Sequence, residues 1–104
     1  MTNGVDEVLA ALADPTRRRL LDALADRGEA TATTLAEDVP VSRQAIVKHL
    51  AVLQQAGLVS SGKQGREVRY HLTSQRLAQT ADWMAGLAAE WDRRLAVIKR
   101  IAES

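Results

Sequence analysis

The segment SRQAIVKHLAVLQQAGLV, residues 42–59, constrains the fold most strongly, because it specifies a helix together with both of its ends. Ser42 can cap the helix by accepting a hydrogen bond from a backbone N–H of the first turn. Gly57 suits the left-handed backbone conformation that commonly follows the last turn of a helix. We therefore expect an amphipathic helix from about Arg43 to Ala56.

This helix has two unlike faces. At about 100° per residue, Ile46, Leu50 and Leu53 form an apolar stripe that predicts burial in the core. A helix on a membrane surface would place large apolar side chains beside its lysines, and the opposite face lacks them, which favours the major groove of DNA. There, Arg43 and Lys48 can reach guanine or phosphate, an amide can pair with adenine, and a valine methyl can contact thymine. The residues of this opposite face are Gln44, Val47, Lys48, Ala51 and Gln55.

The net charge of +1 conceals a strong asymmetry along the chain. From Arg43 to Arg76 there are six basic residues and one acid, Glu67, which gives this segment a net charge of +5. The remaining residues hold 8 basic and 12 acidic side chains, a net charge of −4. Such a division is typical of a protein that meets a polyanion on one side only.

The chain is expected to form one mainly α-helical domain over residues 1–104, with a small β-wing. Residues 34–56 fit a helix-turn-helix, because a short gap at Val39-Pro40-Val41 separates two helical segments. The following residues, 58–72, fit a two-stranded wing. Residues 1–13 and 75–103 are predicted as helices that build a homodimer.

Two shorter features have sequence signatures of their own. Asp14, followed by proline, can cap a second helix. Thr34-x-x-Glu37 fits a capping box for a short helix over Leu35–Asp38, after a brief extended segment at residues 31–33. Arg17-Arg18-Arg19 occupies consecutive helical positions that point in three directions, so we expect these side chains to be solvated or paired with acids.

The wing is predicted as strands 58–63 and 66–72, joined through Gln64 and Gly65. Alternation along the second strand predicts that Val68, Tyr70 and Leu72 face the core. Arg66, at the tip, would be able to enter an adjacent minor groove. The residues expected to contact DNA are Ser42, Arg43, Gln44, Val47, Lys48, Lys63, Arg66 and Arg69.

The last helix carries an apolar seam along nearly its whole length. Leu77, Met84, Trp91 and Ile98 recur every seven residues, and a smaller or apolar residue follows each of them four places later. Packing within one subunit is the alternative, but a domain of this size cannot cover so long a seam, which favours a dimer interface. The expected interface residues are Val5, Leu9, Leu77, Met84, Ala88, Trp91, Leu95 and Ile98.

Three stretches, ALADPTRRRLLDAL, VSRQAIVKHLAVLQQAGLV and GREVRYHL, occur in this order along the chain. Together they resemble the ArsR-type winged-helix transcriptional repressors, and the similarity extends over nearly the whole chain. The resemblance implies a homodimer built by the first and last helices, which binds an inverted repeat in promoter DNA and often represses its own operon. The tail WDRRLAVIKRIAES resembles the subgroup that lacks metal sites.

Other classes of protein find little support. The chain has no cysteine, and His49 and His71 lie in different predicted elements, so we expect neither a metal nor another cofactor. Ser60, Ser61 and His71 lack a nucleophile elbow, so we expect no enzyme. No signal peptide or membrane-spanning run is visible, which predicts a cytoplasmic protein. A winged helix that binds another protein remains the alternative function, and a small-molecule effector stays open.

Overall fold

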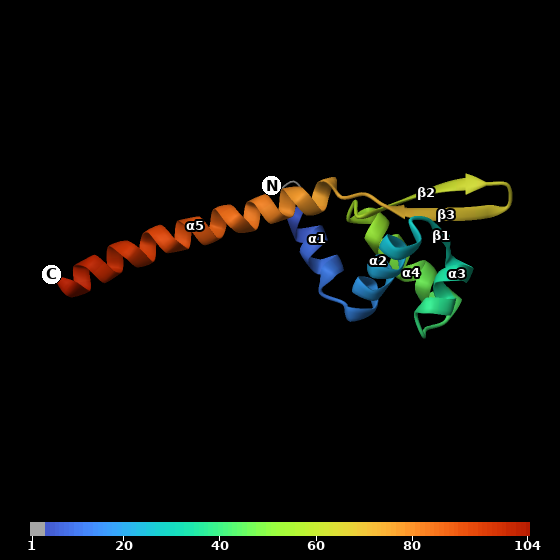
Figure 1. The fold of residues 1–104 in the computed structure, drawn as a ribbon, viewed down its shortest axis with the longest axis horizontal. Coiled ribbons are helices and arrows are strands. Elements are labelled where there is room, and N and C mark those ends of the chain that lie inside the picture. Colours follow the sequence, from blue (N-terminus) through green and yellow to red (C-terminus); the bar gives the residue numbers. More distant parts are fainter. Residues whose placement is uncertain (1–3) are drawn as a thin grey trace.

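The computed structural model describes residues 4–104, so the first three residues of the predicted dimerisation segment 1–13 lie outside the described part (Figure 1). A bundle of short helices carries a small sheet on one side, and one long helix extends away from both (Figure 1). The elements in chain order are α1 (Val5–Leu12), α2 (Pro15–Arg27), β1 (Ala30–Thr31), α3 (Ala32–Asp38), α4 (Arg43–Gln55), β2 (Val59–Gln64), β3 (Glu67–Leu72) and α5 (Gln75–Glu103).

The ends of α2 and α4 confirm the expected caps. Asp14 Oδ1 accepts a hydrogen bond from the backbone N–H of Thr16 at 2.7 Å. Ser42 Oγ accepts one from the backbone N–H of Ala45 at 3.1 Å. After α4, Gly57 has a φ of +79°, a left-handed conformation that a residue with a side chain rarely adopts. Local sequence therefore sets where α4 begins and ends.

The start of α3 differs from the expectation. The helix begins at Ala32, and its cap is Thr31, whose Oγ1 accepts a hydrogen bond from the backbone N–H of Thr34 at 3.1 Å. Thr34 is thus a helical residue and not the cap of a helix over Leu35–Asp38. The reason is tertiary, because Ala30 and Thr31 are already fixed in extended conformation by pairing with β3.

The core lies where α2, α3 and α4 meet. Leu20 and Leu24 of α2 pack with Leu35 of α3 and with the apolar stripe of α4. Ile46, Leu50 and Leu53 are all completely buried, which confirms the predicted inner face of α4. Burying each such side chain contributes about 1.5–3 kcal/mol, so this packing fixes how α4 is held.

The wing hairpin is shifted by one residue from the prediction. Gln64 pairs with Glu67, so the two connecting residues are Gly65 and Arg66 instead of Gln64 and Gly65. Gly65 has a φ of +65°, which suits the first position of such a tight turn. The strand order is β1-β3-β2, with all neighbours antiparallel.

The predicted buried face of β3 is only partly correct. Tyr70 is buried, but Val68 and Leu72 are 39% and 36% exposed. The middle of β3 pairs with β1, whereas the end of β3 at the hairpin tip extends past the helices (Figure 1). Period-two alternation therefore identified the correct face but not its covered length.

The long helix α5 leaves the rest of the domain after its first turns (Figure 1). Its N-terminal part packs beside α1, and the aliphatic stem of Arg76 lies so close to Gly57 that a Cβ there would come within 2.8 Å of Arg76 Cδ. The molecule measures 69 × 25 × 22 Å because the remainder of α5 projects alone. Within residues 4–104, no helix is both long enough and apolar enough to span a membrane.

Candidate nucleic-acid interface

The outer face of α4 is exposed, as the sequence predicted. Its side chains form a continuous polar surface on the side opposite the buried stripe, and Val47 is 39% exposed despite being apolar. An exposed valine beside amides and a lysine can contact the methyl group of thymine. The exposed residues of this face are Gln44, Val47, Lys48, Ala51 and Gln55.

The first turn of α4 is tied to the helix before it. Arg43 Nε donates a hydrogen bond to Thr33 Oγ1 of α3 at 3.2 Å, while the rest of the Arg43 side chain is exposed. Ser42 uses its Oγ as an acceptor for the helix cap, which leaves its O–H free to donate. Both side chains therefore stand at the exposed N-terminal end of α4.

An ion pair fixes α3 relative to α2. Arg27 Nε lies 2.6 Å from Asp38 Oδ2, and Arg27 Nη2 donates to Asp38 Oδ1 at 3.0 Å. The hydrogen bond from this guanidinium holds the pKa of Asp38 below its usual value, and the same bond raises the pKa of Arg27. The pair joins the last residue of α2 to the last residue of α3, so it helps to hold α3 beside α2.

The wing presents its basic residues on different faces. Lys63 pairs with Val68 in the hairpin and shares a sheet face with Ser61, whose Oγ accepts a hydrogen bond from Gln54 Nε2 of α4 at 2.8 Å. This face therefore looks toward α4. Arg66 is exposed in the turn at the wing tip, where the prediction placed it.

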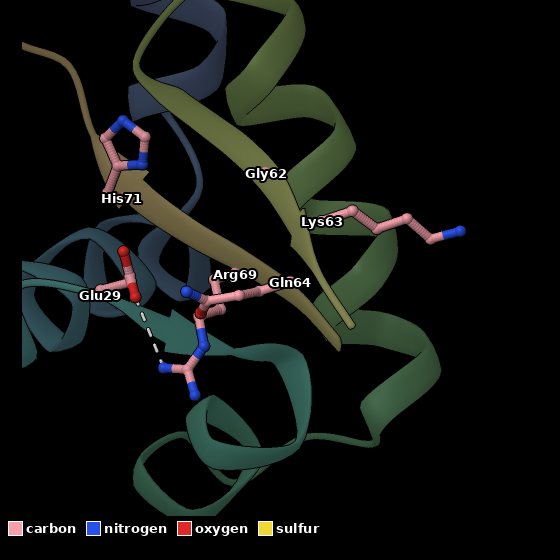
Figure 2. A pocket seen from close by; sticks show the side chains of 6 residues that line it. All are labelled: Glu29, Gly62, Lys63, Gln64, Arg69 and His71. Carbon is pink, nitrogen blue, oxygen red and sulfur yellow. Dashed lines mark hydrogen bonds and ion pairs between the residues drawn. The ribbon is translucent and has the colours of Figure 1, made fainter. Parts of the chain in front are cut away.

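Arg69 lies on the opposite face of the sheet, beside a hollow of about 200 Å³ (Figure 2). Arg69 Nη2 donates to Glu67 Oε1 at 3.0 Å, and Arg69 Nη1 lies 3.5 Å from Glu29 Oε1. Figure 2 shows Lys63 directed away from this pair. Two carboxylates thus neutralise Arg69, and a phosphate would have to displace them to bind it. No pattern in the sequence indicated Glu29, which precedes β1 and is forty residues from Arg69.

The predicted interface residues of α5 share one exposed side of the helix, and most are far more exposed than apolar side chains usually are. Val5, the first residue of α1, is the exception among the predicted interface residues, because it is already buried within the single chain, at 2% exposure. Trp83, Val97 and Ile101 are also exposed on α5 but lie outside the seven-residue seam that located the others. The exposed members of the predicted set are Leu9 (38%), Leu77 (45%), Met84 (52%), Ala88, Trp91 (58%), Leu95 (62%) and Ile98 (60%).

A capped helix with an exposed polar face, the short helix before it and a basic hairpin beside it define a winged helix-turn-helix DNA-binding protein. Residues 12–61 match a family model described as a helix-turn-helix domain. The transcriptional repressor SdpR of Bacillus subtilis is 34% identical over 91 residues, which cover 88% of this chain and 100% of SdpR. The HTH-type transcriptional regulator CmtR of Mycobacterium tuberculosis is 44% identical over 69 residues, covering 66% of this chain and 58% of CmtR.

Solved structures agree with these relatives. An ArsR-like transcriptional regulator from Rhodococcus sp. RHA1 superposes with a TM-score of 0.87 at 51% identity, covering 97% of this chain and 94% of that one. The chain belongs to the ArsR family of transcriptional regulators. The predicted family, the winged helix-turn-helix fold and the function in DNA-binding transcription regulation are thereby confirmed, and the relatives are regulators rather than enzymes.

Replacing Gln44 by alanine should cost about 1–3 kcal/mol of DNA-binding free energy and relax the preference at one base pair in each half-site. The reason is that the Gln44 amide is exposed on the polar face of α4 and is free to pair with a base edge. Binding to a set of single-base operator variants measures this. Arg66→Ala is the matched comparison, since it should weaken binding to A·T-rich flanks and leave the half-site preference intact. Equal losses on specific and random DNA for Gln44→Ala would contradict the assigned role.

Proposed function

We propose that this protein is a metal-independent transcriptional repressor that binds an inverted repeat in promoter DNA as a homodimer. The proposal rests on two features seen together: the exposed outer face of α4, which could contact bases, and the long exposed apolar side of α5. A single 13-residue helix reads only a few base pairs, so useful specificity needs two copies in successive major grooves about 34 Å apart.

The apolar side of α5 supports a homodimer as the arrangement of those two copies. Five large apolar residues between Trp91 and Ile101 are 45–68% exposed, and this part of the helix projects alone. Soluble proteins rarely leave so long an apolar surface in water, and a two-fold symmetric partner would cover it with the same surface. Such an arrangement also gives the two α4 helices the symmetry of an inverted repeat.

The composition supports independence from metal ions. Relatives include a probable mercury resistance operon repressor of Streptomyces lividans and the cadmium metal-sensor CMTR of Mycobacterium tuberculosis. Soft ions of this kind prefer thiolates and imidazoles, and this chain has no cysteine and 2 histidines. In the part of the chain from residue 4 onward, no three histidine, aspartate or glutamate side chains gather closely enough to hold an ion.

Adding Zn²⁺, Cd²⁺ or a chelator should therefore change operator affinity by less than about fivefold, the lower end of coupling in a true sensor. Carboxylates such as Asp82, Glu90 and Asp92 are hard oxygen ligands that do not replace thiolates for these ions. Fluorescence anisotropy on operator DNA with and without each ion measures the effect. A stoichiometric, tight metal site in titration calorimetry would refute the proposal of metal independence.

Footprinting on the DNA upstream of the protein's own gene tests the proposed function most directly. We expect two protected blocks, one helical turn apart and related by two-fold symmetry, and repression of a reporter placed behind that sequence. A half operator should bind much more weakly than the complete one. Absence of any salt-sensitive DNA binding would favour the alternative, a winged helix that binds another protein through Val47 and Ala51.

A further inference from the structure

The C-terminal end of α1 is only weakly capped by its own backbone, through one hydrogen bond from the N–H of Ala13 to the carbonyl oxygen of Ala10 at 3.2 Å. A helix leaves its last four carbonyl groups without partners inside the helix, and α1 has no basic residue in its last turn and no glycine after it. With eight residues, α1 is also too short to be stable in isolation. Its position must therefore be set by contacts with the rest of the domain.

Two arginines from the first turn of α2 donate hydrogen bonds to carbonyl groups at this end of α1. Arg17 Nε donates to the carbonyl oxygen of Ala11 at 2.8 Å, and Arg17 Nη2 donates to that of Ala10 at 3.0 Å. Arg18 Nη1 donates to the carbonyl oxygen of Leu12. Guanidinium groups thus bind three of the last four carbonyls of α1, where the positive charge also complements the helix dipole.

Arg17 is itself held in place. Its side chain is only 17% exposed, and Nη1 lies 3.7 Å from Asp14 Oδ2. Asp14 in turn caps α2, and the hydrogen bond from the backbone N–H of Arg17 holds the pKa of Asp14 below its usual value. The expectation of solvated or acid-paired arginines was thus incomplete, because the main partners of Arg17 and Arg18 are backbone carbonyls.

We infer that Arg17 and Arg18 are positioning residues that fix α1 for dimerisation. The inference rests on the proposed homodimer through α1 and α5. Val5, Val8 and Ala11 of α1 face the protein interior, whereas Leu9 is 38% exposed on the side available to a partner. Without the hydrogen bonds from Arg17 and Arg18, α1 could rotate or fray. Leu9 would then leave that surface, and the packing between α1 and α5 would loosen.

The test compares three variants of the full chain by sedimentation equilibrium. Arg17→Ala should raise the dimer dissociation constant about tenfold or more, as expected for losing charged hydrogen bonds. Arg17→Lys should recover only part of the loss, since an ammonium group cannot reproduce the planar fork that reaches two carbonyls. Arg19→Ala is the matched control, because Arg19 is exposed and, across residues 4–104, has no hydrogen bond or ion pair.

Hydrogen exchange of the α1 amides separates this inference from the dimer itself. In a Trp91→Ala background at low protein concentration, Arg17→Ala should speed exchange in residues 5–12 and leave exchange in α4 unchanged. Faster exchange together with a weaker dimer supports the inference. Unchanged exchange in α1, or faster exchange with an unchanged dimer, overturns it. A wild-type protein that is monomeric would refute the proposed homodimer instead, and the exchange rates would still show whether the arginines hold α1.

Discussion

The affinity for operator DNA is expected to fall by about 10³ to 10⁵ between about 50 and 200 mM salt. Each lysine or arginine that neutralises a phosphate releases counterions, so affinity decreases steeply as salt rises. Lys48, Lys63 and Arg66 are exposed on α4 and the wing, and Arg43 stands at the start of α4. Two protomers would then make about six to ten phosphate contacts. Fluorescence anisotropy over a salt series gives the slope directly.

Lys48 and Arg69 should contribute differently to the salt dependence of DNA binding. Lys48→Gln should reduce the slope of log affinity against log salt by about 2 per dimer, one contact from each protomer. Arg69→Gln should reduce it less, because Glu29 and Glu67 already neutralise Arg69. Lys99→Gln, near the far end of α5, serves as the control and should leave the slope unchanged. Binding that hardly responds to salt would contradict a phosphate interface altogether.

Replacing Trp91 by alanine is expected to dissociate the dimer while leaving each chain folded. Trp91 is 58% exposed in the single chain, so its ring contributes little to the core of one protomer. If a second copy encloses it, truncation costs about 3–5 kcal/mol, which corresponds to a rise of about 10² to 10³ or more in the dimer dissociation constant. Operator binding should fall as well, although Trp91 contacts no base.

Sedimentation equilibrium and a gel-shift assay on full and half operators measure the two effects together. Trp83→Ala is a matched control, since it removes the same ring from α5 at a position outside the seven-residue seam. It should weaken the dimer less than Trp91→Ala does. A Trp91→Ala protein that stays dimeric, with full affinity for the complete operator, would show that the α5 seam is not the interface.

Features that depend on neighbours in the sequence were predictable. Ser42, Asp14 and Gly57 act on backbone groups within a few residues, so the ends of α2 and α4 follow from local chemistry. The alternation of apolar and polar residues at helical spacing likewise determined which side of α4 enters the core. These two features predict from the sequence alone that the outer face of α4, the candidate DNA-contacting surface, is exposed.

Features that depend on distant residues were decided by the tertiary structure. Because Ala30 and Thr31 pair with β3, α3 begins at Ala32 instead of the predicted Leu35. Val68 is exposed because the helices do not extend far enough to cover it. Arg69 pairs with Glu29, which is forty residues away, and Arg17 donates to a carbonyl group at the end of α1. A periodic pattern reports which direction a side chain points, because the backbone repeat is local. What that side chain meets depends on how separate elements pack, which no local pattern encodes.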